Sequence, residues 1–185
     1  MKAFVCAVAG YRPTRFKFKY KENNTGCKRL KKRLHDQFVL LYQQGYRKFW
    51  VGGALGVDMW AGEILLRLKE QPEYEDIELF LVLPFKGHDA GWDERSKNRL
   101  TFLREHCTGI TVAGTEDRAM TENYKLRGKY MVDQADSLVV VYDNEPKSCS
   151  DTGMIFDYAK QKGLRIILIH PDTAQVKELS TNTGM

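Results

Sequence analysis

Residues 51–58 read Val-Gly-Gly-Ala-Leu-Gly-Val-Asp and join a strand-like segment, residues 46–51, to a helical pattern over residues 59–69. Glycine at positions 52, 53 and 56 lets the backbone turn tightly and leaves no Cβ between the amide groups and a ligand. The following helix points the positive end of its dipole, with unpaired N–H groups, at this loop. The stretch is therefore typical of a phosphate-binding loop, although it matches neither the G-x-G-x-x-G fingerprint nor a Walker A loop. The alternative is that the glycines only form a turn.

Apolar strand-like runs alternate with amphipathic helical runs along the whole chain. Residues 137–142 are almost continuously apolar, as in a strand that is buried on both faces. The alternation predicts an α/β fold, a doubly wound parallel sheet with helices on both faces. We expect strands at residues 3–9, 48–51, 78–83, 109–112, 137–142 and 165–169, and helices at residues 25–44, 55–71, 93–107, 119–134 and 152–161.

The chain of 185 residues is long enough for one domain, which we place at residues 1–171. Residues 172–185 are polar and are expected to form a frayed C-terminal tail. No run of about 18 apolar residues occurs, so no membrane span and no membrane partner are expected. The four cysteines are scattered without metal-type spacing, which predicts free thiols in a reducing cytoplasm, no metal and no cofactor.

The net charge of +5 is unevenly distributed, because basic residues concentrate between residues 15 and 33, where Glu22 is the only acid. Such a segment could contact the phosphates of a nucleic acid, or it could be a solvated surface. Phe16, Phe18 and Tyr20 alternate within it and could stack on bases. Nucleic acid is therefore a possible partner, but we favour a small molecule because acid-rich residues 63–78 interrupt the positive charge.

Five motifs follow one another along the chain, four after predicted strands and one on a predicted helix. They are Gly10-Tyr11-Arg12-Pro13, the run from Gly52 to Ala61, Pro84-Phe85 with Trp92, Arg127 with residues 130–133, and Ser150-Asp151-Thr152-Gly153. Together they resemble the SLOG superfamily, a Rossmann-like group that includes the Smf/DprA DNA-processing proteins and the LOG proteins. Within this group the chain is most similar to the stand-alone YpsA-like proteins, over about residues 3–171.

The resemblance implies a single Rossmann-like domain that binds a nucleotide or a nucleotide-derived small molecule across the ends of the strands. Phosphate would bind at the loop of residues 52–58, here called the glycine loop, and at Arg12, whose planar guanidinium suits phosphate oxygens. We expect a cleft there lined by Gly10, Arg12, Gly53, Gly56 and Thr152. The full set of ligand-binding positions that the resemblance implies is Gly10, Arg12, Pro13, Gly52, Gly53, Gly56, Asp58, Phe85, Trp92, Arg127, Ser150, Thr152 and Gly153.

Several of these positions have a second interpretation. Arg12 could form a surface salt bridge instead, and Asp58 could cap the helix instead of accepting ribose hydroxyls. Phe85 and Trp92 could cover a base or pack in the core. Asp151 is part of a Ser-Asp pair where the family has two glycines, so it adds a negative charge beside any phosphate and disfavours a highly charged ligand.

No catalytic residue is assigned from the sequence. Phosphoribohydrolases of the LOG type carry P-G-G-x-G-T-x-x-E, and this string is absent. Glu63 as a base and Cys149 as a nucleophile are the remaining candidates. Three functions follow: a nucleotide sensor or regulatory protein, which we favour; an N-glycosidic hydrolase of nucleoside monophosphates or NAD-derived nucleotides; and a relative of the DNA-processing proteins that binds single-stranded DNA.

Two predicted helices carry more apolar residues than one buried face needs, which predicts a homodimer or a higher oligomer. The residues concerned are Trp60, Ile64, Leu65 and Leu66 on the first helix, and Tyr124, Tyr130 and Met131 on the second.

Overall fold

A sheet of seven strands in the order β4-β3-β2-β1-β5-β6-β7 runs through the described part of the chain. The computed structural model describes residues 2–145 and 150–179. All strands are parallel except β7, which pairs antiparallel with β6. The strands are β1 (Phe4–Gly10), β2 (Tyr46–Val51), β3 (Glu78–Leu83), β4 (Gly109–Val112), β5 (Ser137–Val141), β6 (Arg165–Ile169) and β7 (Val176–Leu179).

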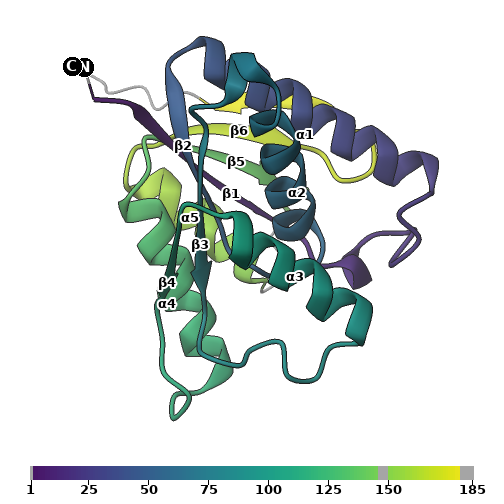
Figure 1. The fold of residues 1–185 in the computed structure, drawn as a ribbon, viewed down its shortest axis with the longest axis vertical. Coiled ribbons are helices and arrows are strands. Elements are labelled where there is room, and N and C mark those ends of the chain that lie inside the picture. The colour runs from purple at the N-terminus through teal and green to yellow at the C-terminus, as the bar shows by residue number, and fades with distance from the viewer. Residues whose placement is uncertain (1, 146–149, 180–185) are drawn as a thin grey trace.

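Helices cover both faces of this sheet (Figure 1). Helices α1 (Thr25–Gln43), α2 (Val57–Lys69) and α3 (Glu94–His106) lie on one side, and α4 (Met120–Asp133) and α5 (Asp151–Gln161) lie on the other. The chain builds outward from β1 to β4, and then returns to place β5 and β6 on the opposite side of β1. The prediction of a doubly wound α/β fold in a Rossmann-like arrangement is confirmed.

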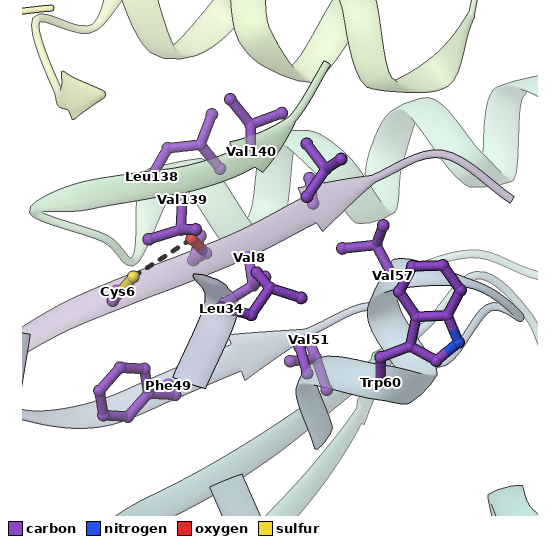
Figure 2. Close-up of a cluster of buried hydrophobic side chains, with 14 of the residues drawn as sticks. Cys6, Val8, Leu34, Phe49, Val51, Val57, Trp60, Leu138, Val139 and Val140 are labelled. Atoms are coloured by element: carbon purple, nitrogen blue, oxygen red, sulfur yellow. Dashed lines mark hydrogen bonds between the residues drawn. The ribbon is translucent and has the colours of Figure 1, made fainter. Parts of the chain in front are cut away.

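The core lies between the central strands and the helices that cover them. Figure 2 shows Val8 of β1, Phe49 and Val51 of β2, Leu34 of α1 and Trp60 of α2 in one cluster of buried side chains. All five residues of β5 are buried, as its apolar run predicts for a strand covered on both faces.

The expectation of a frayed tail is wrong for residues 176–179, because they form β7 at the edge of the sheet. The turn before it is closed by hydrogen bonds from Ala174 N–H to the His170 carbonyl (2.8 Å) and from His170 N–H to the Gln175 carbonyl (2.9 Å). Arg165 of β6 pairs with Glu178 of β7 at 2.6 Å. A polar edge strand is an ordinary way of covering a sheet edge, but it carries no apolar pattern that sequence reasoning could use.

The apolar residues that suggested an oligomer are mostly buried within the single chain. Trp60, Leu65 and Leu66 of α2, and Tyr124 and Met131 of α4, are all less than a tenth exposed. Helix α2 contacts α1 and α3 as well as the sheet, so it needs apolar residues on more than one face. The oligomeric state stays a prediction, and these buried side chains cannot form its interface. In the described part of the chain, no helix is both long and apolar enough to cross a membrane.

An ion-pair network holds the basic segment against the helices. The Arg99 guanidinium donates to Glu22 at 2.6 Å and to Glu63 at 3.1 Å, and the Lys31 ammonium donates to Glu22 at 2.7 Å. Burial by itself raises the pKa of Glu22, but the hydrogen bonds from Arg99 and Lys31 outweigh it and lower the pKa to about 2.

The network predicts a loss of stability in acid. Glu22 ionises more readily in the folded chain than in the unfolded chain, so its contribution is present above a pH of about 4.5 and is lost as the pH falls toward about 2. We expect Glu22→Gln to lower the melting temperature at pH 7 and to flatten its decline between these two pH values. Thermal unfolding from pH 2 to 7 measures both effects, with Glu73→Gln as an exposed control. Parallel curves for Glu22→Gln and the wild type would contradict this role.

Candidate functional site

A cavity of about 260 Å³ opens at the carboxyl ends of β1, β2 and β5. It lies where the strand order reverses between β1 and β5, which is where doubly wound sheets bind their ligands. Loops after three strands and one side chain from α4 meet there. The lining residues are Ala9, Gly10, Tyr11, Arg12, Thr14, Arg15, Ala54, Asp58, Arg127, Ser150, Asp151, Thr152 and Ile155.

The structure brings six of the predicted ligand-binding residues into this lining and leaves the other seven outside it. Gly10, Arg12, Asp58, Arg127, Ser150 and Thr152 line the cavity. Pro13, Gly52, Gly53, Gly56, Phe85, Trp92 and Gly153 do not. The glycine loop therefore supports the cavity, and only Ala54 and Asp58 of this segment reach its surface.

Gly56 brings the loop after β1 against the start of α2. Its backbone has φ 86° and ψ −131°, and a Cβ there would lie 2.5 Å from the Tyr11 carbonyl oxygen. The Val57 N–H donates to the same carbonyl at 3.2 Å. Helix α2 begins at Val57, two residues later than predicted, because the Gly56 backbone is not helical. Gly56 thus fixes the position of the Arg12 loop without touching the cavity.

Side chains from other elements hold the peptide groups of the glycine loop. Arg127 donates from Nη1 to the Gly52 carbonyl at 2.8 Å, and His88 contacts the Gly53 carbonyl through Nε2 at 3.0 Å. The Ala54 N–H donates to Asp58 Oδ2 at 3.2 Å. The Gly53–Ala54 peptide group is therefore held at both its oxygen and its nitrogen. His88 must carry its proton on Nε2 to donate, and burial lowers its pKa.

The floor of the cavity is a buried ion pair between Arg127 of α4 and Asp58 of α2. Arg127 Nη1 lies 3.5 Å from Asp58 Oδ2, and the two side chains are 6% and 5% exposed. A Cβ at Gly52 would lie 2.7 Å from both side chains, so only glycine fits beside the pair. Burial raises the pKa of Asp58, although the Arg127 charge opposes this. Asp58 accepts from the loop N–H of Ala54 and also lines the cavity, but it does not cap α2, which begins without a side-chain capping hydrogen bond.

Arg127 has unused hydrogen-bonding capacity. Its guanidinium carbon lies 4.9 Å from the centre of the Tyr124 ring. Within the described residues, its Nε–H is buried and has no hydrogen-bond partner. A buried donor without a partner costs about 1–3 kcal/mol of stability. An acceptor from outside the chain that reached this donor would remove that cost.

The mouth of the cavity carries a second, more exposed ion pair. Arg12 Nη2 lies 2.8 Å from Asp151 Oδ2, with side chains 46% and 32% exposed. The Arg12 guanidinium also stacks on Tyr124, 4.3 Å from the ring centre. The salt bridge foreseen as the alternative for Arg12 therefore exists, and it lies at the cavity. Ser150 accepts from the Gly153 N–H at 3.1 Å and caps α5.

Tyr11 connects the loops after β1 and β5 below this mouth. Its hydroxyl donates to Asp143 Oδ1 at 2.6 Å, and the Arg15 guanidinium lies 4.8 Å from the centre of its ring. Burial and the hydrogen bond to Asp143 raise the pKa of Tyr11 to about 12. The hydroxyl therefore stays protonated at neutral pH and acts as a donor.

The two predicted aromatic covers, Phe85 and Trp92, pack around His88 instead of lining the cavity. Their ring centroids lie 6.3 Å and 5.3 Å from that of His88. The interpretation as packing residues is favoured for both. No sequence pattern indicates a role for His88, because its contact is with a backbone carbonyl 35 residues away.

The candidate catalytic residues gain no support. Glu63 is hydrogen-bonded to Arg99 and lies outside the cavity lining, and Cys149 lies outside the described residues. Among residues 2–145 and 150–179, no group of three or more His, Cys, Asp or Glu side chains could hold a metal ion.

Two of the three aromatic residues of the basic segment, Phe16 and Phe18, pack in or against the core instead of forming an open platform. Phe16 is 4% exposed, stacks on Phe18 at 4.9 Å and lies 5.3 Å from Trp60. Tyr20 is 64% exposed, so it alone of the three aromatics in the segment is free to stack on a base.

Comparison with known proteins agrees with this architecture. The family described as the YspA SLOG family (YpsA) matches residues 6–174. UPF0398 proteins of Bacillus cereus and Bacillus thuringiensis are 30% identical over 162 residues, which cover 86% of this chain and 84% of each relative. The chain therefore belongs to the YpsA family of SLOG proteins, a nucleotide-related group with a Rossmann-like fold.

Proposed function

We propose that the chain binds a nucleotide or a nucleotide-derived small molecule in the cavity between β1 and β5, and that it acts as a sensor or regulatory protein. The observation that carries the proposal is the buried Arg127 guanidinium in the cavity floor, with an Nε–H that lacks a partner among the described residues. A phosphate oxygen is a strong acceptor for such a group.

The surroundings of Arg127 suit a phosphorylated ligand with a polar body. The start of α5 also lines the cavity, but Asp151 already places a carboxylate at this positive end of the helix dipole. The carboxylates of Asp58 and Asp151 can accept hydrogen bonds from ribose hydroxyls. The volume of 260 Å³ is slightly below the usual range of about 300–1,000 Å³ for ligand pockets, which favours one nucleotide over a dinucleotide.

A sensor is favoured over a hydrolase because the groups in the described lining are suited to binding. The two carboxylates are ion-paired with Arg127 and Arg12, and the Tyr11 hydroxyl is held by Asp143. The single-stranded DNA alternative loses its stacking platform, because Phe16 is buried.

A thermal-shift screen tests the proposal. We expect AMP to raise the melting temperature, because a ligand at 100 times its Kd stabilises the folded state by about 2.7 kcal/mol. Adenosine, which lacks the phosphate, should give a much smaller shift at the same concentration. ADP, ADP-ribose and NAD complete the screen, and product analysis of each hit separates binding from hydrolysis.

Three outcomes would contradict the proposal. Equal shifts in melting temperature from AMP and adenosine would show that the phosphate does not contribute to binding. No shift from any of the nucleotides at millimolar concentration would show that the ligand is not one of these nucleotides. Release of free base from a hit would replace the sensor with the hydrolase alternative.

A further inference from the structure

We propose that Asp151 is a specificity-determining residue that limits the negative charge accepted by the cavity, so that the site takes one phosphate group and discriminates against a second. The inference rests on the proposed function and concerns the same site. It starts from the place of the Asp151 carboxylate, which lines the cavity at the first residue of α5.

The first turn of a helix is where an anion is favoured, because its N–H groups lack partners within the helix and its dipole end is positive. Asp151 places a carboxylate of this chain beside that position, in the first turn of an 11-residue helix. A phosphate that approached the start of α5 would meet a like charge. The Asp151 carboxylate therefore competes with a ligand phosphate for this end of the cavity.

Asp151 also engages the cation that a second phosphate would need. Arg12 is fixed between the Asp151 carboxylate, 2.8 Å away, and the Tyr124 ring, 4.3 Å away. Its charge is largely neutralised by this ion pair. A ligand phosphate at the mouth would have to displace Asp151 from Arg12 and then remain next to the displaced carboxylate.

The charges of the side chains that line the cavity also favour a ligand with a single phosphate. Three guanidinium groups, from Arg12, Arg15 and Arg127, face two carboxylates, from Asp58 and Asp151, which leaves a net charge of +1. A phosphate monoester carries about −1.5 to −2 at neutral pH, so one such group already exceeds the positive charge available. Each further phosphate adds negative charge without a cation left to balance it.

Exposure indicates which end of the cavity takes the first phosphate. The Arg127–Asp58 pair is about 5% exposed and forms the floor, whereas the side chains of Arg12 and Asp151 are 46% and 32% exposed at the mouth. Arg127, whose buried Nε–H has no partner among the described residues, belongs to the floor. We therefore place the first phosphate at the Arg127 guanidinium, so that the remainder of the ligand extends toward the mouth and passes Asp151.

The test compares AMP and ADP by calorimetric titration of the wild type, Asp151→Asn and Asp157→Asn. Asn keeps the shape of the side chain and an oxygen that can accept from Arg12. Asp157 is the matched control, because it is an exposed aspartate on the same helix and is not part of the lining. We expect Asp151→Asn to tighten ADP binding about tenfold and AMP binding at most about twofold, since it removes one like charge within a few ångströms of the second phosphate.

The control variant should bind both ligands within about twofold of the wild type, because an exposed charge outside the cavity is well screened. An unchanged ratio of ADP to AMP affinity in Asp151→Asn, in a protein that binds AMP, would overturn this inference and leave the proposed function standing. A wild type that binds ADP more tightly than AMP would overturn it equally. Failure of all three proteins to bind either nucleotide would contradict the proposed function itself and this inference with it.

Discussion

Replacing Gly56 with alanine will lower the free energy of unfolding by about 3 kcal/mol or more, the sum expected for a forbidden backbone conformation and a steric overlap. Only glycine adopts φ 86° and ψ −131° without strain. The added Cβ would lie 2.5 Å from the Tyr11 carbonyl oxygen and 3.0 Å from the Arg12 Cα. Because both contacts are with backbone atoms, no side chain can move to relieve them. Urea denaturation of the two proteins measures the difference.

Gly87 provides the matched control for this substitution. It also has a positive φ, 81°, but nothing lies within 4 Å of a Cβ built there. Gly87→Ala therefore measures the strain of a positive φ without a steric overlap, which we expect to cost about 1 kcal/mol. Equal losses of stability in the two variants would show that the contact between the Arg12 loop and the start of α2 contributes nothing.

Replacing Arg127 with methionine will cost about 3–5 kcal/mol of stability, because it leaves the buried Asp58 carboxylate without its cation. The loss includes the hydrogen bond to the Gly52 carbonyl, which fixes the first peptide group of the glycine loop. Methionine keeps most of the buried length of the side chain, so the packing of α4 changes little.

The double variant Arg127→Met with Asp58→Asn separates charge from packing. We expect it to regain at least half of the lost stability, since the neutral amide no longer requires a cation. Thermal and urea unfolding of both variants give the comparison. If the single variant is as stable as the wild type, the Arg127–Asp58 pair does not hold the glycine loop.

The sheet, the helices and their order could be predicted from the sequence because buried parallel strands are nearly continuous apolar runs. Residues 137–142 show this, since the strand found there is buried along its whole length. Strand β7 could not be predicted, because Val176–Leu179 is an edge strand with mostly exposed side chains. Its pairing depends on Arg165 and on a turn at Ala174, and neither produces a periodic pattern.

The candidate site could be predicted where a motif directly follows a strand and where the family resemblance supplied a position on a helix. Gly10 and Arg12 lie at the end of β1, whereas the resemblance supplied the helical residues Asp58, Arg127 and Thr152, and all five line the cavity. The glycine loop indicated the right region, yet its glycines support neighbouring segments and leave the cavity surface to other residues. The family motif indicated Arg127, but its bond to the Gly52 carbonyl spans 75 residues of sequence, and the bond of His88 to the Gly53 carbonyl spans 35, so no local pattern could reveal these contacts.

The most direct test of the account is calorimetric titration of AMP into two proteins, Asp58→Asn and the double variant Asp58→Asn with Arg127→Met. Both lack the buried carboxylate, so they differ only in the guanidinium at the cavity floor. We expect the double variant to bind AMP at least about tenfold more weakly, the usual loss when a hydrogen bond to a charged group is removed. Equal affinities in the two proteins would show that Arg127 does not hold the phosphate and would contradict the account.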